Sequence, residues 1–85
     1  MTTFIDTLQD RHGNTWQVND RALYRIPGVR TDACRIMQLI PFTSDPVHIA
    51  AIRVEFDDLG GFPTVEPESL ELIRRRTADE KPIID

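Results

Sequence analysis

Few side chains in this 85-residue sequence have the type and spacing that catalysis needs. The run Ser44-Asp45-Pro46-Val47-His48 places a serine, an acid and a histidine close together, as in a hydrolase. A catalytic triad requires the histidine to lie between the other two groups in space, beside an oxyanion hole. A single short loop can hardly hold that geometry. We therefore predict no catalytic residue and no enzymatic activity.

The remaining candidate groups favour structural roles. Asp57 and Asp58 are adjacent carboxylates, which could share a cation or raise one another's pKa. Neighbouring residues of a hairpin point to opposite sides, however, and no further oxygen ligands follow at loop spacing. His12 and His48 have no local partner at ligand spacing. Cys34 is the only cysteine, so we expect a small core residue rather than a disulfide or zinc ligand. The sequence predicts no metal and no cofactor.

The charges are unevenly distributed along the chain. The net charge is −4, from 10 basic and 14 acidic residues. Residues 1–40 hold five Arg against four Asp, whereas residues 41–73 hold only Arg53 against seven acids. The second half is therefore expected to form a negative surface, which is a poor partner for nucleic acid. Nucleic-acid binding remains an alternative through the arginines of the first half: Arg21, Arg25, Arg30 and Arg35.

Length and composition favour one small domain. We assign residues 1–73 to it and residues 74–85, which are polar and aperiodic, to a flexible C-terminal tail. Within this tail Arg74-Arg75-Arg76 falls short of the basic clusters that recognise lipid. No apolar run approaches the roughly 18 to 20 residues of a membrane span, and residues 1–6 lack the features of a secretory signal. We expect a soluble, cytoplasmic protein.

Alternating apolar residues and turn signals predict a mainly β domain. Gly13 and Asn14 supply the positive φ of a hairpin turn, and Pro27-Gly28 marks another turn. A bulge is expected near Met37, because strict alternation fails there. Pro67 to Leu70 predicts a 3₁₀ turn that places Leu70 on the end of the domain. The predicted strands are residues 3–9, 15–18, 21–25, 33–40, 48–56 and 62–65.

Two segments carry a resemblance to a known fold. Asn19-Asp20-Arg21-Ala22-Leu23-Tyr24 resembles the opening strand of many SH3-like domains, where a Gly-Asp-Arg-Val stretch leads into the first strand. The run from Val54 to Gly61, followed by Val65 and Leu70, is similar to the Tudor branch of that superfold. The resemblance covers residues 19–72. It implies a small five- to six-stranded SH3-like barrel with a short 3₁₀ turn near the C-terminus.

The resemblance does not bring the family's ligand with it. Tudor domains read methylated Arg or Lys with an aromatic cage. Here Leu59 stands at the cage Tyr position, Gly61 at the Asn position and Thr31-Asp32 at the upstream aromatic. A second barrel family that the chain resembles is the plasmid-borne type II dihydrofolate reductase, whose active run is Val-Gln-Ile-Tyr-Pro. Thr64 and Glu66 replace its Gln and Tyr, which argues against that activity.

The predicted function is therefore binding of a protein partner, as an adaptor or inhibitor. Apolar residues beside a polar rim are the usual mark of such a face, although some of them could close the barrel ends instead. The predicted binding residues are Leu23, Met37, Phe42, Asp57, Asp58, Phe62 and Glu66, and Ile83-Ile84 belongs to the same apolar set.

An acidic face could also imitate a phosphate backbone. We expect a phage or plasmid origin from the chain's size, and the enzymatic alternative is a homo-oligomeric barrel with a site between subunits.

Overall fold

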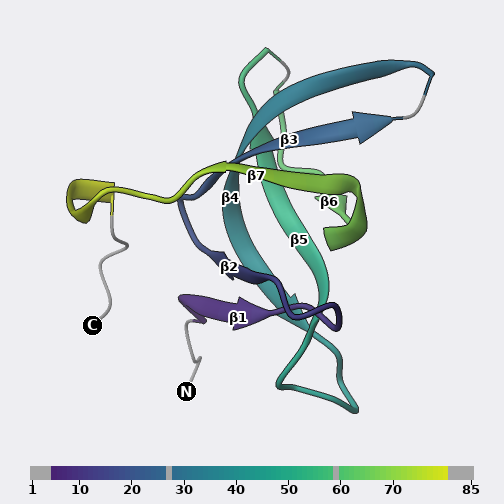
Figure 1. Ribbon diagram of the computed structural model, residues 1–85, viewed down its shortest axis with the longest axis vertical. Helices are drawn as coiled ribbons and strands as arrows, with labels where there is room; N and C mark the ends of the chain where they lie inside the picture. Colours follow the sequence, from purple (N-terminus) through teal and green to yellow (C-terminus); the bar gives the residue numbers. More distant parts are fainter. Residues whose placement is uncertain (1–4, 27, 59, 81–85) are drawn as a thin grey trace.

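The computed structural model describes residues 5–26, 28–58 and 60–80, and these form two antiparallel β-sheets (Figure 1). The smaller sheet pairs β1 (Thr7–Gln9) with β2 (Thr15–Gln17). The larger sheet has the order β6-β5-β4-β3-β7. Its strands are β3 (Arg21–Ile26), β4 (Arg30–Pro41), β5 (Ile49–Phe56), β6 (Thr64–Val65) and β7 (Leu70–Arg74). Two 3₁₀ turns complete the chain, η1 (Pro67–Ser69) and η2 (Ala78–Glu80).

The predicted mainly β domain with a 3₁₀ turn near the C-terminus is confirmed. Strands β3 to β6 follow one another as a meander, and η1 then carries the chain back so that β7 pairs with β3. The sheet is open, because β6 pairs only with β5 and β7 only with β3 in the described residues. The closed barrel of the sequence prediction is therefore not seen in the hydrogen-bond pattern.

Local turn signals placed the turns, but β4 begins at Arg30 rather than at residue 33, and β1 and β6 are shorter than predicted. The hairpin of β1 and β2 is confirmed, with Gly13 at φ 87°. The positive φ expected for Asn14 is wrong, because Asn19 is the one non-glycine residue with a positive φ among those the structure describes. Gly28, at φ 75°, lies in the turn between β3 and β4, as expected. Four predicted features fall wholly or partly outside the described residues: positions 3 and 4 of the first strand, Pro27, Leu59 and the Ile83-Ile84 pair. Nothing in the structure bears on them.

Strand β7 is the main error of the sequence prediction, which ended the strands at Val65. Leu70–Arg74 pairs antiparallel with β3, with Leu70 opposite Tyr24 and Leu72 opposite Ala22. The alternation of Leu70, Glu71 and Leu72 was the available signal. Its partner strand lies far away in the sequence, so no turn signal marks this pairing.

The predicted bulge in β4 is confirmed at Met37. Ile36 pairs with Val54 and Leu39 with Ile52, and the register shifts between Ile36 and Gln38. The extra residue matters because Ile36 and Leu39 are three positions apart, and without it they would face opposite sides of the sheet. With the bulge, both side chains are buried.

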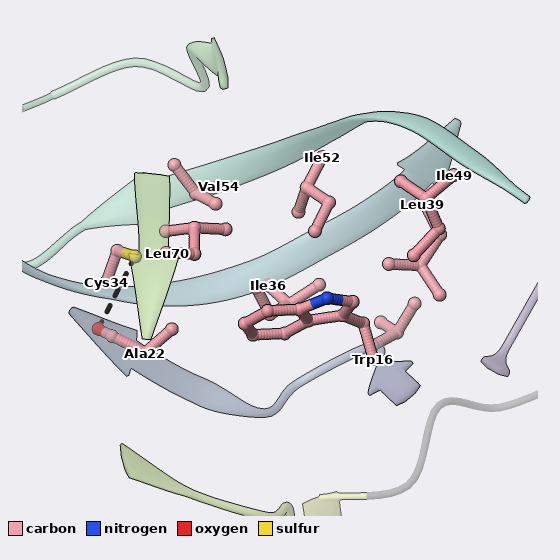
Figure 2. Close-up of a cluster of buried hydrophobic side chains, with 10 residues drawn as sticks. Trp16, Ala22, Cys34, Ile36, Leu39, Ile49, Ile52, Val54 and Leu70 are labelled. Carbon is pink, nitrogen blue, oxygen red and sulfur yellow. Dashed lines mark hydrogen bonds between the residues drawn. The ribbon is translucent and has the colours of Figure 1, made fainter. Parts of the chain in front are cut away.

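One hydrophobic cluster fills the space between the larger sheet and the hairpin (Figure 2). The indole of Trp16 lies beside Ile36 in the middle of this cluster. Cys34 is buried as predicted, and its Sγ lies 3.5 Å from the carbonyl oxygen of Ala22. Burial raises the pKa of this thiol to about 11, so it stays neutral at neutral pH. The buried members are Trp16, Val18, Ala22, Cys34, Ile36, Leu39, Ile49, Ile52, Val54 and Leu70.

Truncation of Ile52 tests this core. Ile52 is fully buried between Leu39 of β4 and Val65 of β6. We expect Ile52→Ala to lower the free energy of unfolding by about 2–5 kcal/mol, because it removes buried methyl groups and leaves a cavity. Val47→Ala is the control, since Val47 is 64% exposed, and should cost less than about 0.5 kcal/mol. Urea unfolding followed by the fluorescence of Trp16 measures both, and equal losses would contradict the assignment.

Candidate functional site

The predicted binding residues come from β3, from β4 and the segment after it, and from the turns on either side of β6. Leu23 is on the face of β3 opposite the buried Ala22, and Met37 is the bulge residue of β4. The ring of Phe42 lies 3.8 Å from the guanidinium of Arg11, which covers it. The other four residues, Asp57, Asp58, Phe62 and Glu66, lie in the β5–β6 turn and before η1. Of these seven, Leu23 and Asp57 both adjoin Ala33, which pairs with Leu23 and accepts a hydrogen bond from the backbone N–H of Asp57.

Cross-strand ion pairs neutralise much of the expected acidic surface. The pairs are Arg21 with Asp57, Arg25 with Glu71 at 2.6 Å and Arg35 with Glu55 at 2.8 Å. The hydrogen bond from Arg21 holds the pKa of the Asp57 carboxyl below its ordinary value. Each pair joins an arginine of the first half of the chain to an acid of the second half. Arginines from the first half of the chain and acids from the second half therefore lie side by side in the folded protein.

Asp57 and Asp58 line a wide, open hollow of about 610 Å³ at the β5–β6 turn. The carboxylate of Asp58 has no partner in the described part of the chain. No group of three or more His, Cys, Asp or Glu side chains suited to a metal ion occurs among the described residues. The hollow also lacks a buried polar side chain that could orient a ligand, which well-formed sites usually have.

The loop that carries Ser44 brings two of its three candidate groups together. Nδ1 of His48 lies 2.9 Å from Oδ2 of Asp45, and this hydrogen bond holds the pKa of Asp45 below its ordinary value. Arg11 lies 3.4 Å from the same oxygen. Ser44 makes no hydrogen bond within the described ranges. The Asp45–His48 bond closes the loop, and the bond from Arg11 to Asp45 attaches the loop to the hairpin.

A narrower groove of about 280 Å³ lies between β2 and β7, and the sequence prediction named none of its residues as binding residues. Asn14, Thr15 and Trp16 line one side, and β7 and Arg75 line the other. The two strands run in the same direction (Figure 1) and belong to different sheets. The β7 residues at the groove are Leu70, Glu71 and Leu72.

The hairpin turn fixes the indole that forms the floor of this groove. The carboxylate of Asp10 is buried and accepts hydrogen bonds from the backbone N–H groups of His12 and Asn14, at 2.8 and 3.0 Å. It also accepts one from Nε1 of Trp16 at 3.1 Å. Burial opposes ionisation, but the hydrogen bonds outweigh it and hold the pKa of Asp10 below its ordinary value. Trp16 is thereby held in one orientation.

A second buried carboxylate joins the hairpin to the end of β7. Asp20 is 0% exposed and accepts hydrogen bonds from the backbone N–H of Gln17 at 3.0 Å and of Arg76 at 2.8 Å. The guanidinium of Arg75 donates a further bond of 2.8 Å. The backbone can reach this position because Asn19 adopts φ 75°, which asparagine tolerates better than most residues.

Arg76 strengthens the same junction. Its guanidinium binds both oxygens of Asp6 and also donates to the carbonyl oxygen of Val18 at 3.2 Å. The hydrogen bond to Asp6 raises the pKa of Arg76. We call Asp6, Asp20, Arg75 and Arg76 the terminal clamp. The sequence prediction placed both arginines in a flexible, solvated tail, whereas in the structure each is bonded to a carboxylate.

The opposite end of the groove is bridged as well. Nε2 of His12, in the hairpin turn, lies 3.5 Å from the carboxylate of Glu68 in η1. The hairpin and the last strand are thus connected at both ends, while the described residues show no ladder between β2 and β7. These bridges at the two ends leave the edges of β2 and β7 unpaired, in the described part of the chain, on either side of the groove, whose lining includes Trp16.

Comparison with protein family models, with curated proteins and with solved structures finds no match for this chain. The described residues also include no helix that is long and apolar enough to cross a bilayer.

Acid titration tests the role of Asp10. A carboxyl whose folded pKa lies below its unfolded value stabilises the protein above the unfolded pKa and loses this contribution as pH falls through the folded pKa. We expect the free energy of unfolding to fall between about pH 5 and pH 2, and Asp10→Asn to make this fall shallower. Asp79→Asn changes an exposed carboxylate and is the control. Urea unfolding over this pH range measures the slopes; identical slopes for wild type and Asp10→Asn would refute the assignment.

Proposed function

We propose that this chain is a non-enzymatic protein-binding module that holds an apolar side chain of its partner in the groove between β2 and β7. The observation that carries this proposal is the combination of a Trp16 floor with walls formed by Leu70 and Leu72. Partner side chains that dominate binding energy usually fill pockets of this kind. Such a module can act as an adaptor or as an inhibitor.

The groove exposes apolar surface on β7, above all at Leu72, which is 36% exposed. Ile73 alternates onto the other face of the strand and does not line the groove. Full burial of an apolar side chain is worth about 1.5–3 kcal/mol, so a partner that covers Leu72 gains binding energy. A polar rim surrounds it, since Asn14, Glu71 and Arg75 line the same groove. An apolar centre with a polar rim is the usual composition of a protein interface.

The rival surfaces have less support. An acidic face that imitates nucleic acid needs unpaired carboxylates, but Glu55, Asp57 and Glu71 are bonded to arginines. Nucleic-acid binding needs arginines that can reach phosphate, and three of the four arginines expected to do so are the partners in those bonds. The apolar residues that line the groove, Trp16, Leu70 and Leu72, take part in none of these ion pairs.

We also propose that the larger sheet is an open member of the SH3-like superfold. Five strands with one 3₁₀ turn before the last strand are the pattern of these small barrels. The order β6-β5-β4-β3-β7, with η1 directly before β7, supports the assignment. Fold alone does not specify a ligand, so the binding proposal depends on the groove.

Selection of random peptides displayed on phage tests the binding proposal. Peptides enriched on the wild-type protein should bind Leu72→Glu about tenfold more weakly or worse, because a charge then lies in the groove. Phe62→Ser is the control, since Phe62 is 53% exposed and does not line the groove. It should bind the same peptides as wild type does. Circular dichroism confirms that both variants fold. Failure to enrich any peptide that Leu72→Glu rejects would overturn the proposal.

A further inference from the structure

The groove lies between two strand edges. Strand β2 pairs only with β1 and β7 only with β3 within the described ranges, so each strand has an unpaired edge. Thr15 of β2 and Leu70 to Leu72 of β7 line the groove that separates them. An unpaired edge presents backbone N–H and C=O groups and is a template for another strand. This groove therefore presents backbone groups as well as apolar side chains.

A strand that adds to the free edge of β7 in the groove also runs antiparallel to β2. Strands β2 and β7 run in the same direction (Figure 1), so a segment antiparallel to one is antiparallel to the other. Every ladder between the described strands is antiparallel, and antiparallel pairing is slightly more stable per residue than parallel pairing. An added strand would extend the larger sheet into the groove.

The side chains of such a segment must alternate. On β7, Leu70 and Leu72 lie opposite the inward-facing Tyr24 and Ala22, whereas Glu71 lies opposite Leu23 on the other face. Because strands alternate with a period of two, every second residue of the segment faces Trp16 and should be apolar. The intervening residues face solvent beside Glu71 and should be polar.

Charges at the two ends of the groove define a direction. Glu68 lies just before β7 begins, and Arg75 lies just after it finishes. Arg75 donates one bond to Asp20 and, with 43% of its side chain exposed, has further N–H groups for a ligand. Opposite charges across a strand pair are favourable. An antiparallel segment thus meets Arg75 with its N-terminal end and Glu68 with its C-terminal end.

We propose that the groove binds a partner segment as an added β-strand, antiparallel to β2 and β7, with alternating apolar residues, an acidic residue at its N-terminal end and a basic residue at its C-terminal end. This inference rests on the proposed protein-binding function. Main-chain hydrogen bonds supply affinity in this mode, and the alternate side chains supply specificity.

Three synthetic peptides test the proposal on the full chain. The first is acetyl-Asp-Thr-Val-Thr-Leu-Thr-Val-Lys-amide, and the second exchanges its terminal Asp and Lys. The third keeps the first sequence but carries N-methyl groups on the three threonines, which removes alternate N–H donors and leaves the apolar side chains unchanged. Titration followed by the fluorescence of Trp16 gives the affinities, and amide exchange by NMR identifies the strands involved.

The first peptide should bind about threefold or more tightly than the second, because both of its terminal charges face opposite charges. It should slow amide exchange in β2 and β7, and N-methylation should weaken binding about tenfold or more. Glu68→Lys should reduce the preference for the first peptide, whereas Asp58→Lys, at the distant β5–β6 turn, should leave it unchanged.

Each other outcome overturns a defined part of the account. Equal affinity for the first two peptides would refute the proposed strand direction. Unchanged affinity after N-methylation would refute binding as an added strand. Neither result would refute the proposed function, in which the groove holds an apolar side chain of the partner. If the peptides bind only to a variant that ends at Glu80, the groove is assigned to residues 81–85 of this chain. If they bind only to a dissociated form seen in sedimentation, the groove is assigned to a second copy of the chain. If no peptide binds and phage selection also fails, the proposed function itself is overturned.

Discussion

The carboxylate of Asp20 is fully buried and takes hydrogen bonds from Gln17 on one side and from Arg75 and Arg76 on the other. Burial of a carboxylate costs several kcal/mol unless paired groups and hydrogen bonds compensate it. These donors come from the end of β2 and from the segment after β7, so compensation requires the two to lie together. The bond between Arg76 and Asp6 adds the start of the hairpin to the same junction. This terminal clamp attaches the hairpin to the end of β7, while the backbone bonds of Asn19 and Asp20 with Ile36 attach the same turn to β4.

The clamp also explains why the groove stays open. Side-chain bridges hold β2 and β7 at their ends, through Asp20 at one end and through His12 and Glu68 at the other. Between these bridges the described strands form no ladder, and Trp16 is held at the floor by Asp10. A small domain has a thin core, and exposing part of it in a groove reduces the hydrophobic stabilisation available. Such a feature fits a site that a partner covers.

Local features of the fold were predictable from the sequence, and distant ones were not. The hairpin at Gly13, the bulge at Met37 and the 3₁₀ turn at Pro67 each follow from a few neighbouring residues. The pairing of β7 with β3 and the burial of Asp20 depend on residues far apart in the chain. Arginines and acids look like solvated charges in a sequence, because nothing local indicates their partners. The groove was missed for this reason, since it is made where β2 and β7 meet.

Hydrogen exchange of individual backbone amides in Asp20→Ala, compared with wild type, tests the clamp most directly. Removal of this carboxylate takes the acceptor from Gln17 and from Arg76, whereas the ladder of β4 with β5 keeps all its bonds. We predict faster exchange in β2, in β7 and at residues 75–76, with β4 and β5 still protected. Unchanged protection in β2 and β7, or an equal loss of protection in all strands, would contradict the account.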